Sequence, residues 1–284
     1  MLKVLITGAH GQLGSEINFL SSLLETHNFV FTDKDDLDIT NAAAVQDLIA
    51  GGKYSTVINC AAYTAVDKAE SEKEIAYKIN ADAAGYLAKA CSETGAQYVH
   101  VSTDFIFDGS IARPLLEDDT PNPLGIYGAS KLEGEKLTLA NNPHAIIFRT
   151  AWVYSSFGAN FVKTILRLCK ERESINVIYD QVGSPTYARD LAGAILKVVQ
   201  SPSPKPGVYN YSNEGVASWY DFAVAIRDMA GLKTKINPIE TSQYPTPAAR
   251  PKYSLLNKKK VKETFGLEIP YWRDSLEQCM RLLK

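Results

Sequence analysis

The sequence has few cysteines and histidines, and their placement argues against a disulfide scaffold or a metal centre. Four cysteines are spread over 284 residues with no C-x-x-C spacing, at Cys60, Cys91, Cys169 and Cys279. The four histidines form no cluster with the spacing of metal ligands. We therefore expect reduced thiols and no metal site, as in a cytosolic protein.

An excess of charge of one sign and long apolar runs are also missing. The formal net charge is -2, so the chain has no basic field that would attract nucleic acid or an anionic membrane. No apolar run approaches the roughly 20 residues that span a bilayer. The first residues, MLKVLITG, lack the apolar core of a signal peptide. We expect a cytoplasmic protein that binds neither nucleic acid nor membranes.

The first half of the chain alternates apolar strands with helical periodicity. Strands rich in Val and Ile are expected at 3–7, 29–33, 56–60, 97–104 and 145–154. Helices are expected between them at 12–24, 41–50, 72–95 and 127–140. Gly95 is expected to end the third of these helices. Such βαβ units predict an α/β fold whose parallel sheet is covered on both faces.

The second half is less regular and predicts a smaller lobe that interleaves with the sheet. Helices are expected at 161–173, 188–200 and 218–231, and a short strand at 175–180. Ser218 is a plausible N-cap. We expect residues 1–150, with returning segments near 175–212, to form a nucleotide-binding domain. The substrate-binding lobe would consist mostly of residues 151–174 and 213–284.

Three glycines follow the first expected strand and open the first expected helix. They are Gly8, Gly11 and Gly14, in the stretch ITGAHGQLGSE. Glycine permits a tight turn and lets the backbone approach a pyrophosphate at a helix N-terminus. An ordinary strand–helix turn is the alternative, but the position in the first βα unit favours a dinucleotide.

The stretch after the second strand, FTDKDDLDIT, carries opposite signals for the cofactor. Asp33 lies 19 residues after the last of these glycines and could bond a ribose 2′-hydroxyl, which favours NAD. Lys34 could instead meet a 2′-phosphate, so the choice between NADH and NADPH stays open. Asp38 and Ile39 could flank the adenine, although a polar loop with a helix cap explains their positions almost as well.

Polar and small residues lie where ligands bind in open α/β sheets, beyond the carboxyl ends of strands. The fourth expected strand ends in Ser102, Thr103 and Asp104, and a hydroxyl there could bond a substrate carbonyl. A simple cap or turn is the alternative. After the third strand, the small residues of NCAAYTAVDKAE (59–70) leave room for a ribose, and close helix packing explains them equally well.

Tyr127 and Lys131 are four residues apart in YGASK, so they share a face of an expected helix. Alone the pair could be an ordinary surface pair. Together with Thr103 it is typical of a proton-delivery site. The unperturbed pKa of tyrosine is about 10, and a nearby ammonium and the charge of the cofactor are expected to lower it. The phenol could then protonate a carbonyl oxygen near neutral pH.

These motifs, in this order and spacing, resemble the extended short-chain dehydrogenase/reductase family. Within that family, longer stretches are similar to the reductases of dTDP-4-dehydro-L-rhamnose. They are GAHGQLGSE, NCAAYTAVDKAE, VSTDFIFDG, YGASKLEGE, RTAWVY, NFVKTILRL, DQVGSPTYARDLA and ARPKYSLLN, between residues 7 and 257. The resemblance implies a Rossmann-type doubly wound parallel sheet. It also implies hydride transfer from NADPH or NADH to the C4 keto group of that nucleotide sugar.

The resemblance further implies roles for individual residues. Tyr127 would be the general acid, Lys131 would tune it and hold the nicotinamide ribose, and Thr103 would bond the keto oxygen. The pyrophosphate would lie against Gly8, Gly11, Gln12, Leu13 and Gly14. The cofactor's adenosine and ribose side would be bound by Asp33, Asp38, Ile39, Ala61, Ala62 and Thr64. The nucleotide sugar would contact Val66, Thr103, Asp104, Trp152 and, through its diphosphate, Arg250.

Two features depart from the family pattern. Tyr63 stands where relatives often carry histidine. Some relatives are thought to dimerise through a metal held by carboxylates. Glu16 matches the first of these carboxylates, but Arg189 stands where a second is expected, with Asp190 beside it. The sequence thus predicts no metal site, and a homodimer stays open.

Two other functions stay open. Another nucleotide-sugar reductase, or an epimerase of the same fold, would carry the same motifs. A non-catalytic regulatory subunit, such as that of methionine adenosyltransferase, also resembles these reductases. The presence of Thr103, Tyr127 and Lys131 favours an enzyme, and consumption of NAD(P)H with a keto-sugar nucleotide would distinguish the two classes.

Overall fold

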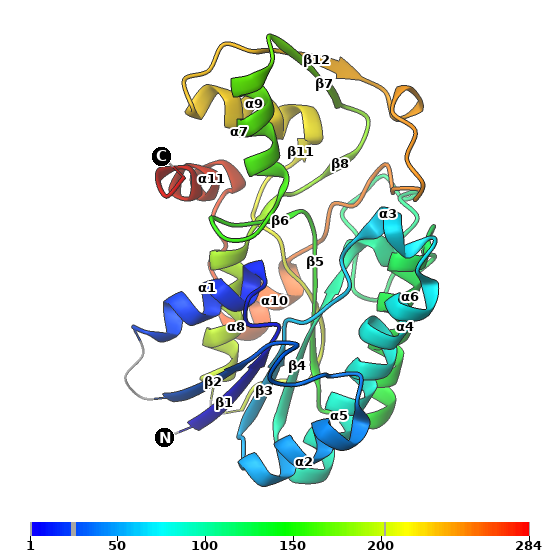
Figure 1. The fold of residues 1–284 in the computed structure, drawn as a ribbon, viewed down its shortest axis with the longest axis vertical. Coiled ribbons are helices and arrows are strands. Elements are labelled where there is room, and N and C mark those ends of the chain that lie inside the picture. The colour runs from blue at the N-terminus through cyan, green and yellow to red at the C-terminus, as the bar shows by residue number, and fades with distance from the viewer. Residues whose placement is uncertain (1, 24–26, 202, 284) are drawn as a thin grey trace.

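The computed structural model describes residues 2–23, 27–201 and 203–283, and a six-stranded sheet lies at its centre (Figure 1). The strand order is β10-β5-β4-β3-β1-β2, and all neighbours pair in parallel. The strands are β1 (Leu2–Thr7), β2 (His27–Thr32), β3 (Thr56–Asn59), β4 (Gln97–Thr103), β5 (Ile146–Thr150) and β10 (Gly207–Asn210). The order reverses between β1 and β3, which is where ligands bind in such sheets. The predicted Rossmann-type α/β fold is confirmed.

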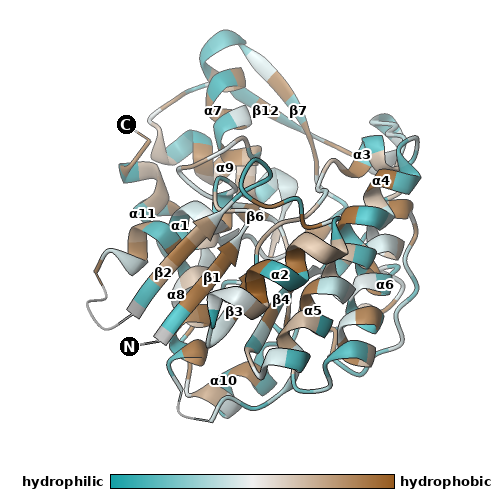
Figure 2. Cartoon of the chain, turned by 60° about the horizontal axis from the view of Figure 1, so that its bottom comes forward, coloured by the Kyte–Doolittle hydropathy of each residue, from teal (hydrophilic) through white to brown (hydrophobic). Residues whose placement is uncertain are grey.

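Helices cover both faces of the sheet because its strands are apolar on both sides (Figure 2). Val4 and Ile6 of β1 belong to one buried cluster and Leu5 to the other. Helices α1 (Gln12–Ser21) and α8 (Ala188–Val199) pack on the first face. Helices α2 (Ala42–Gly52), α5 (Ala83–Thr94) and α6 (Ile126–Asn141) cover the second. No described helix is both long and apolar enough to cross a membrane.

The helix expected at 72–95 is interrupted. It consists of α4 (Lys73–Tyr77), a π-helical turn (Lys78–Asp82) and α5, and it ends at Gly95 with a φ of 73°, as predicted. Helix α1 ends at Ser21, and residue 24 of its expected range lies outside the described residues. Helix α2 begins after Asn41, whose side chain accepts from the amide of Ala44.

The prediction of one strand over 145–154 is wrong. Strand β5 ends at Thr150, and the short β6 (Val153–Tyr154) pairs with β9 (Thr186–Tyr187) outside the main sheet. Trp152 lies between them with a left-handed φ of 49°. Such a backbone cannot continue a strand, so it redirects the chain into the second lobe.

The second lobe has its own apolar core and lies above the sheet in Figure 1. Helix α9 (Trp219–Met229) begins with a capping box between Ser218 and Asp221, which confirms the predicted N-cap. The other elements of the lobe are α7 (Phe161–Glu171), β7 (Ser174–Ile178), β12 (Lys235–Ile239) and α11 (Trp272–Arg281). The sequence did not predict β12 or α11.

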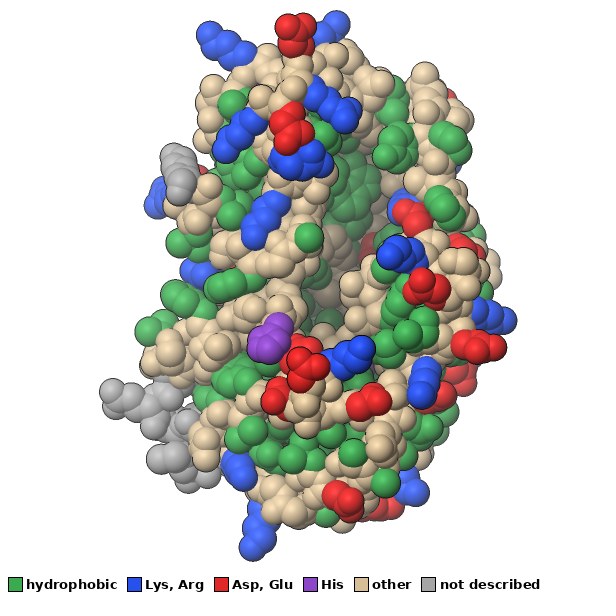
Figure 3. Space-filling model, viewed as in Figure 1, with side chains coloured by type: hydrophobic (Ala, Val, Ile, Leu, Met, Phe, Trp, Pro, Cys, Tyr) green, Lys and Arg blue, Asp and Glu red, His purple; other side chains and the backbone are tan. Residues whose placement is uncertain are grey.

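The remaining elements are short and connect the two parts. They are α3 (Val66–Ala69), the 3-10 turns Asp104–Ile106 and Thr241–Gln243, β8 (Val182–Gly183), β11 (Ala217–Ser218) and α10 (Lys259–Phe265). A deep hollow separates the second lobe from the sheet in the space-filling view (Figure 3). The carboxyl ends of the strands therefore face a cleft rather than bulk solvent.

Candidate active site

The glycine loop after β1 fits a dinucleotide pyrophosphate. Gly8 has a φ of 69°, and a Cβ there would lie 2.6 Å from the amide nitrogen of Ala61. A Cβ on Gly14 would overlap the carbonyl of Gly8. Gly11 is the N-cap of α1, so backbone amides of the first turn are available to an anion. Side chains would fill this cradle, and glycine leaves it open to phosphate.

Two of the expected pyrophosphate residues use their side chains elsewhere. Leu13 is buried in the core between α1 and the sheet. The Gln12 amide accepts from Asn160 at 3.0 Å and approaches the carbonyl of Val153 at 3.5 Å. Only the backbone of Gln12 and Leu13 is therefore placed to bind phosphate, and the side chain of Gln12 holds the second lobe against α1.

A cavity of about 440 Å³ continues from the glycine loop along the ends of β1, β2 and β3. Asp33, Asp38, Ile39, Ala61 and Ala62 line it, as expected from the sequence. The sequence analysis missed its other wall, because the long helix gave no cofactor signal. That wall consists of Ile75, Lys78 and Ile79, from α4 and the π-helical turn.

The Asp33 carboxylate holds the turn that contains it. Its two oxygens accept from the backbone amides of His10 and Lys34, both at 2.8 Å. Burial would raise the pKa of Asp33, but these bonds and the His10 ring lower it overall. Bonds from Thr40 lower the pKa of Asp38, with smaller help from Lys78 and Lys34. Both carboxylates are therefore ionised and partly satisfied before any ligand binds.

The residues after β3 extend the cleft toward the second lobe. Ala61 and Ala62 lie in the cavity wall, whereas the exposed Thr64 and the half-buried Val66 lie beyond it at the start of α3. Tyr63 donates to Glu72 at 2.5 Å. This bond to the Glu72 carboxylate raises the pKa of Tyr63 to about 12.

The structure brings Thr103 and Tyr127 together. Thr103 ends β4. A hydrogen bond between its hydroxyl and the phenol of Tyr127 lowers the pKa of that phenol. Helix α6 comes this close because Gly128 has no side chain, since a Cβ there would overlap the carbonyl of Phe105. The Phe105 ring meets Tyr127 edge-on at 5.5 Å. Gly128 is a functional position that sequence reasoning missed, although it stands inside YGASK.

The expected lowering of the pKa of Tyr127 is not present in the protein alone. Burial raises the pKa of Tyr127 to about 12, the Thr103 bond lowers it, and the charge of Asp104 raises it. Lys131 is not among the groups that shift the pKa of Tyr127, and its Nζ donates to the carbonyl of Val101 at 2.6 Å. Burial lowers the pKa of Lys131 itself to about 8, against the influence of Glu135. The chain therefore keeps Tyr127 protonated, which suits a general acid.

Asp104 lies directly under this pair. Its Oδ1 accepts from Thr103 at 3.1 Å, and its other oxygen is buried without a hydrogen-bond partner among the described residues. Burial raises the pKa of Asp104 to about 6, although bonds from Ser254 and Thr103 oppose the shift. Through its bond with Thr103, the residue before it, Asp104 is placed to orient the Thr103 hydroxyl.

Trp152 is held rigidly where the chain leaves the sheet. Its ring stacks on Trp219 with centroids 3.7 Å apart and planes at 12°. A Cβ on Gly183 would lie 3.1 Å from the same ring. Trp219 was missed because 67 residues separate it from its partner, and no local pattern links them. The pair forms a flat aromatic wall at the base of the second lobe.

Arg250 is engaged in the protein rather than free for a diphosphate. Its two terminal nitrogens bond both oxygens of Asp67 at 3.0 and 2.9 Å. Asp67 belongs to α3 of the sheet region, so the pair spans the cleft. The guanidinium also donates to Thr246 and to the carbonyl of Ala248. The bond to Arg250 is the largest influence on Asp67 and lowers its pKa.

The carboxylate considered as a metal ligand is also engaged. Glu16 is fully buried, accepts from Ser155 at 2.6 Å and pairs with Arg189 at 2.7 Å. Asp190 accepts from Asn213 and Ser275. The described residues contain no group of three or more His, Cys, Asp or Glu side chains that could hold a metal ion.

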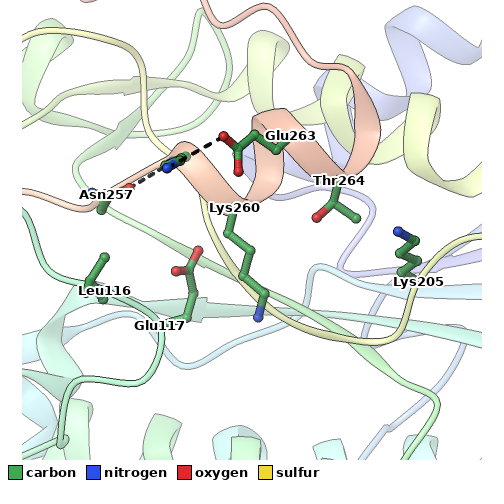
Figure 4. A pocket seen from close by; sticks show the side chains of 8 residues that line it. Leu116, Glu117, Lys205, Asn257, Lys260, Glu263 and Thr264 are labelled. Carbon is green, nitrogen blue, oxygen red and sulfur yellow. Dashed lines mark hydrogen bonds and ion pairs between the residues drawn. The ribbon is translucent and has the colours of Figure 1, made fainter.

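A second hollow lies apart from this cleft, beside α10 and the edge strand β10 (Figure 4). Its charged residues are Glu117, Lys205, Lys259, Lys260 and Glu263. Lys259 pairs with Glu263 at 3.8 Å, and Lys260 donates to the carbonyl of Val208. None of the residues proposed from the sequence lines it.

The family follows from a comparison of the whole chain with known proteins. A family model described as RmlD substrate binding domain matches residues 2–284. The chain belongs to this family. A relative in the RmlD family, a dTDP-4-dehydrorhamnose reductase of Aggregatibacter actinomycetemcomitans, is 40% identical over 287 residues and covers 98% of both chains. The spore coat polysaccharide biosynthesis protein SpsK of Bacillus subtilis is 40% identical, over 99% of this chain and 98% of its own.

Solved structures agree with this family. A dTDP-4-dehydrorhamnose reductase from Clostridium acetobutylicum superposes with a TM-score of 0.96, at 44% identity over 99% of both chains. The Bacillus anthracis protein of the same name, in complex with NADP, gives 0.94 at 40% identity over 99% of both. MoeE5 in complex with UDP-glucose and NAD shares the fold alone, at 19% identity. The resemblance drawn from the motifs is confirmed at the level of the family.

Proposed function

We propose that the protein is a reductase that converts the C4 keto group of dTDP-4-dehydro-L-rhamnose to the alcohol of dTDP-L-rhamnose. The observation that carries the proposal is the placement of Thr103 at the carboxyl end of β4 and Tyr127 on the adjoining α6, at the same edge of the sheet as the open glycine cradle after β1. The names of relatives at about 40% identity over nearly the whole chain support the substrate. NADPH or NADH would supply the hydride.

Individual residues take different roles in the proposed reaction. Tyr127 donates its phenolic proton to the reduced C4 oxygen, and its raised pKa keeps that proton in place until the oxygen becomes basic. Thr103 orients the phenol and the keto oxygen. Gly8, Gly11 and Gly14 hold the pyrophosphate against α1. Lys131, one helical turn from Tyr127, would contact the nicotinamide ribose after its Nζ leaves the carbonyl of Val101.

The adenosine end favours NADPH over NADH. Both oxygens of Asp33 already accept backbone amides, so this carboxylate is partly used in shaping the turn. Lys34 and Lys78 line the same cavity and provide positive charge toward a 2′-phosphate. The NADP complex of the Bacillus anthracis relative supports this preference. We therefore expect a higher kcat/KM with NADPH than with NADH.

The substrate cleft would lie between the two parts of the chain. Residues 1–150 with segments near 175–212 would bind the cofactor, and most of 151–174 and 213–284 would bind the nucleotide sugar. Trp152, Val66 and Asp104 would shape the sugar site, and Arg250 would meet the diphosphate after leaving Asp67. A cytoplasmic location and a homodimer are further expectations, which cell fractionation and analytical ultracentrifugation test.

The first experiment is oxidation of NADPH and NADH with dTDP-4-dehydro-L-rhamnose, followed by absorbance, for the native protein and Tyr127→Phe. We expect turnover by the native protein and a loss of about 10²- to 10⁴-fold in kcat for the variant, because the proton donor is removed. Binding of cofactor without turnover would contradict this substrate. It would favour another nucleotide sugar or a regulatory role.

A further inference from the structure

A buried chain of polar side chains beneath Tyr127 has no place in the roles described so far. It leads from Asn59 at the end of β3 through His100 in β4 to Lys131 in α6, and none of the three is more than 2% exposed. Asn59 Nδ2 lies 3.2 Å from His100 Nδ1. His100 Nε2 lies 3.4 Å from Lys131 Nζ. Each contact joins neighbouring elements of the sheet region (Figure 1).

A backbone donor fixes the orientation of the Asn59 amide. The amide N–H of Ala61 can only donate, and it lies 3.1 Å from Asn59 Oδ1, which also accepts from Thr7 at 2.7 Å. The Asn59 nitrogen must therefore face Tyr98 and His100. Because an amide nitrogen only donates, His100 Nδ1 has to accept. The neutral ring then carries its proton on Nε2.

This tautomer directs an N–H at the lysine. An ammonium group has three donors and no acceptor, so Lys131 in its charged form would oppose a donor on His100. A neutral amine would accept that N–H and still donate to the carbonyl of Val101. Burial, and then the charge of Lys131, lower the pKa of His100 well below its usual value. The ring is therefore neutral, with its single proton on Nε2 directed at Lys131.

We propose that His100, oriented by Asn59, is a positioning residue that makes Lys131 give up its ammonium proton more readily. The use of that proton rests on the proposed function, in which Lys131 lies one helical turn from Tyr127. Among the described residues, the titratable groups that act on this pair are Tyr98 in β4, whose ring stacks on His100, and Glu135 in α6, while Tyr127 lies one turn away on α6. Glu135 favours the ammonium, but it is committed to Arg149 at 2.8 Å.

The tautomer of His100 is measured directly by ¹⁵N NMR on protein labelled at histidine, without substrate or cofactor. The signal of His100 is assigned by its loss in His100→Gln. We expect a neutral ring with the proton on Nε2 in the native protein. In Asn59→Asp, a carboxylate oxygen replaces the amide donor, so we expect the proton to move to Nδ1. A native ring protonated on Nδ1 would overturn the proposal.

The effect on the lysine is measured by ¹³C NMR titration of protein labelled at lysine Cε, with Lys131→Met to assign the signal. We expect the midpoint of Lys131 to rise by about one unit or more in Asn59→Asp, because Nε2 then becomes an acceptor for the ammonium. His100→Gln offers an N–H close to the position of Nε2 and an oxygen toward Asn59. It should keep the native midpoint.

The double variant Asn59→Asp, His100→Phe separates the ring from the bare charge of the new carboxylate. Two shifts of the Lys131 midpoint are compared. One is the shift from native protein to Asn59→Asp, and the other is the shift from His100→Phe to the double variant. We expect the second shift to be less than half of the first. An equal shift would show a direct charge effect and would overturn the proposal. These NMR measurements need no turnover, so a negative result for the proposal is distinguishable from a failure of the proposed activity. His100→Gln tests the proposal even if Asn59→Asp does not fold.

Discussion

The two walls of the cleft are made in different ways. The cofactor wall is a stretch of backbone in which Gly8, Gly11 and Gly14 leave space, and they fall within seven consecutive residues. The wall proposed for the substrate, called the substrate wall below, consists of large side chains that meet from distant parts of the chain. Trp152 stacks on Trp219, and Arg250 reaches Asp67. A local motif thus specifies the first wall, while the second depends on how the lobes pack.

This difference predicts where substitutions act. A side chain added to the cofactor wall overlaps backbone atoms, and moving closely packed backbone costs free energy. A side chain removed from the substrate wall leaves the backbone unchanged and removes one contact among several. The first wall should therefore respond with large losses, and the second with graded changes.

The largest effect is expected for Gly8→Ala. The substitution combines a left-handed φ with an overlap against Ala61. It should lower the free energy of unfolding by about 3 kcal/mol or more and abolish cofactor binding. Urea unfolding and fluorescence titration with NADPH measure the two effects. Gly95→Ala is the matched control, since its φ is also positive but its Cβ would meet nothing within 4 Å, and it should cost only about 1–2 kcal/mol.

Asp104→Asn tests the effect of burying a carboxyl group at the end of β4. Burial raises the pKa of Asp104 from 3.8 to about 6, so the native state binds this proton more tightly than the unfolded chain. Between these pH values, rising pH should lower the free energy of unfolding of the native protein by about 3 kcal/mol through this group. Asp104→Asn lacks this titrating group. Its free energy of unfolding should therefore rise relative to that of the native protein between pH 4 and pH 7.

Asp108→Asn is the control with the opposite sign. Bonds from Ser110 and Asn122 lower the pKa of Asp108, so its carboxylate contributes stability that is present above its unfolded pKa and is lost as the pH falls. The free energy of unfolding of Asp108→Asn should therefore fall relative to that of the native protein as the pH rises. Urea unfolding at several pH values measures both variants, and parallel curves for Asp104→Asn and native protein would contradict the burial argument.

Trp219→Leu should have a moderate effect on the substrate wall. It removes the aromatic partner of Trp152, and stacked pairs contribute about 1 kcal/mol beyond their buried area. We expect KM for the nucleotide sugar to rise about fivefold with little change in KM for NADPH. Trp219→Phe keeps an aromatic ring, so its KM for the nucleotide sugar should lie between the values of the native protein and Trp219→Leu. An equal rise in both KM values would show a general loss of folding instead.

The smallest effect is expected for the pair that spans the cleft. Arg250 and Asp67 are 22% and 40% exposed in their side chains, so solvent screens their attraction. A double-mutant cycle with Asp67→Asn and Arg250→Gln should give a coupling energy of about 0.5–1 kcal/mol in urea unfolding. Asp67→Asn alone should lower KM for the nucleotide sugar if Arg250 must leave Asp67 to meet the diphosphate. An unchanged KM would contradict that role.

Much of the fold was predictable because its signals are local. Apolar strands with intervening helices indicated a parallel α/β sheet, and Gly95 and Ser218 marked helix ends correctly. The break at Trp152 was not predictable, since its left-handed backbone is imposed by packing against Trp219 and Gly183 rather than by its own preference. The short elements after residue 232 gave no periodic pattern long enough to assign.

The site was predicted as a set of residues but not as a set of environments. Spacing alone placed Tyr127 and Lys131 on one helical face, and the end of β4 gave Thr103. The sequence could not show that the Nζ of Lys131 lies 2.6 Å from the carbonyl of Val101 and 3.4 Å from His100 Nε2. It also could not show that burial raises the pKa of Tyr127 to about 12.

The sequence by itself determined the order of the elements, the glycine cradle and the helix face shared by Tyr127 and Lys131, because each depends on residues close to one another in the chain. The tertiary structure decided how deeply those groups are buried and which partners they meet. Burial and hydrogen bonding set pKa values, and both arise from segments such as β3, β4 and α6 that are joined only when the chain folds. For Lys131, the decisive neighbours His100 and Asn59 are 31 and 72 residues away.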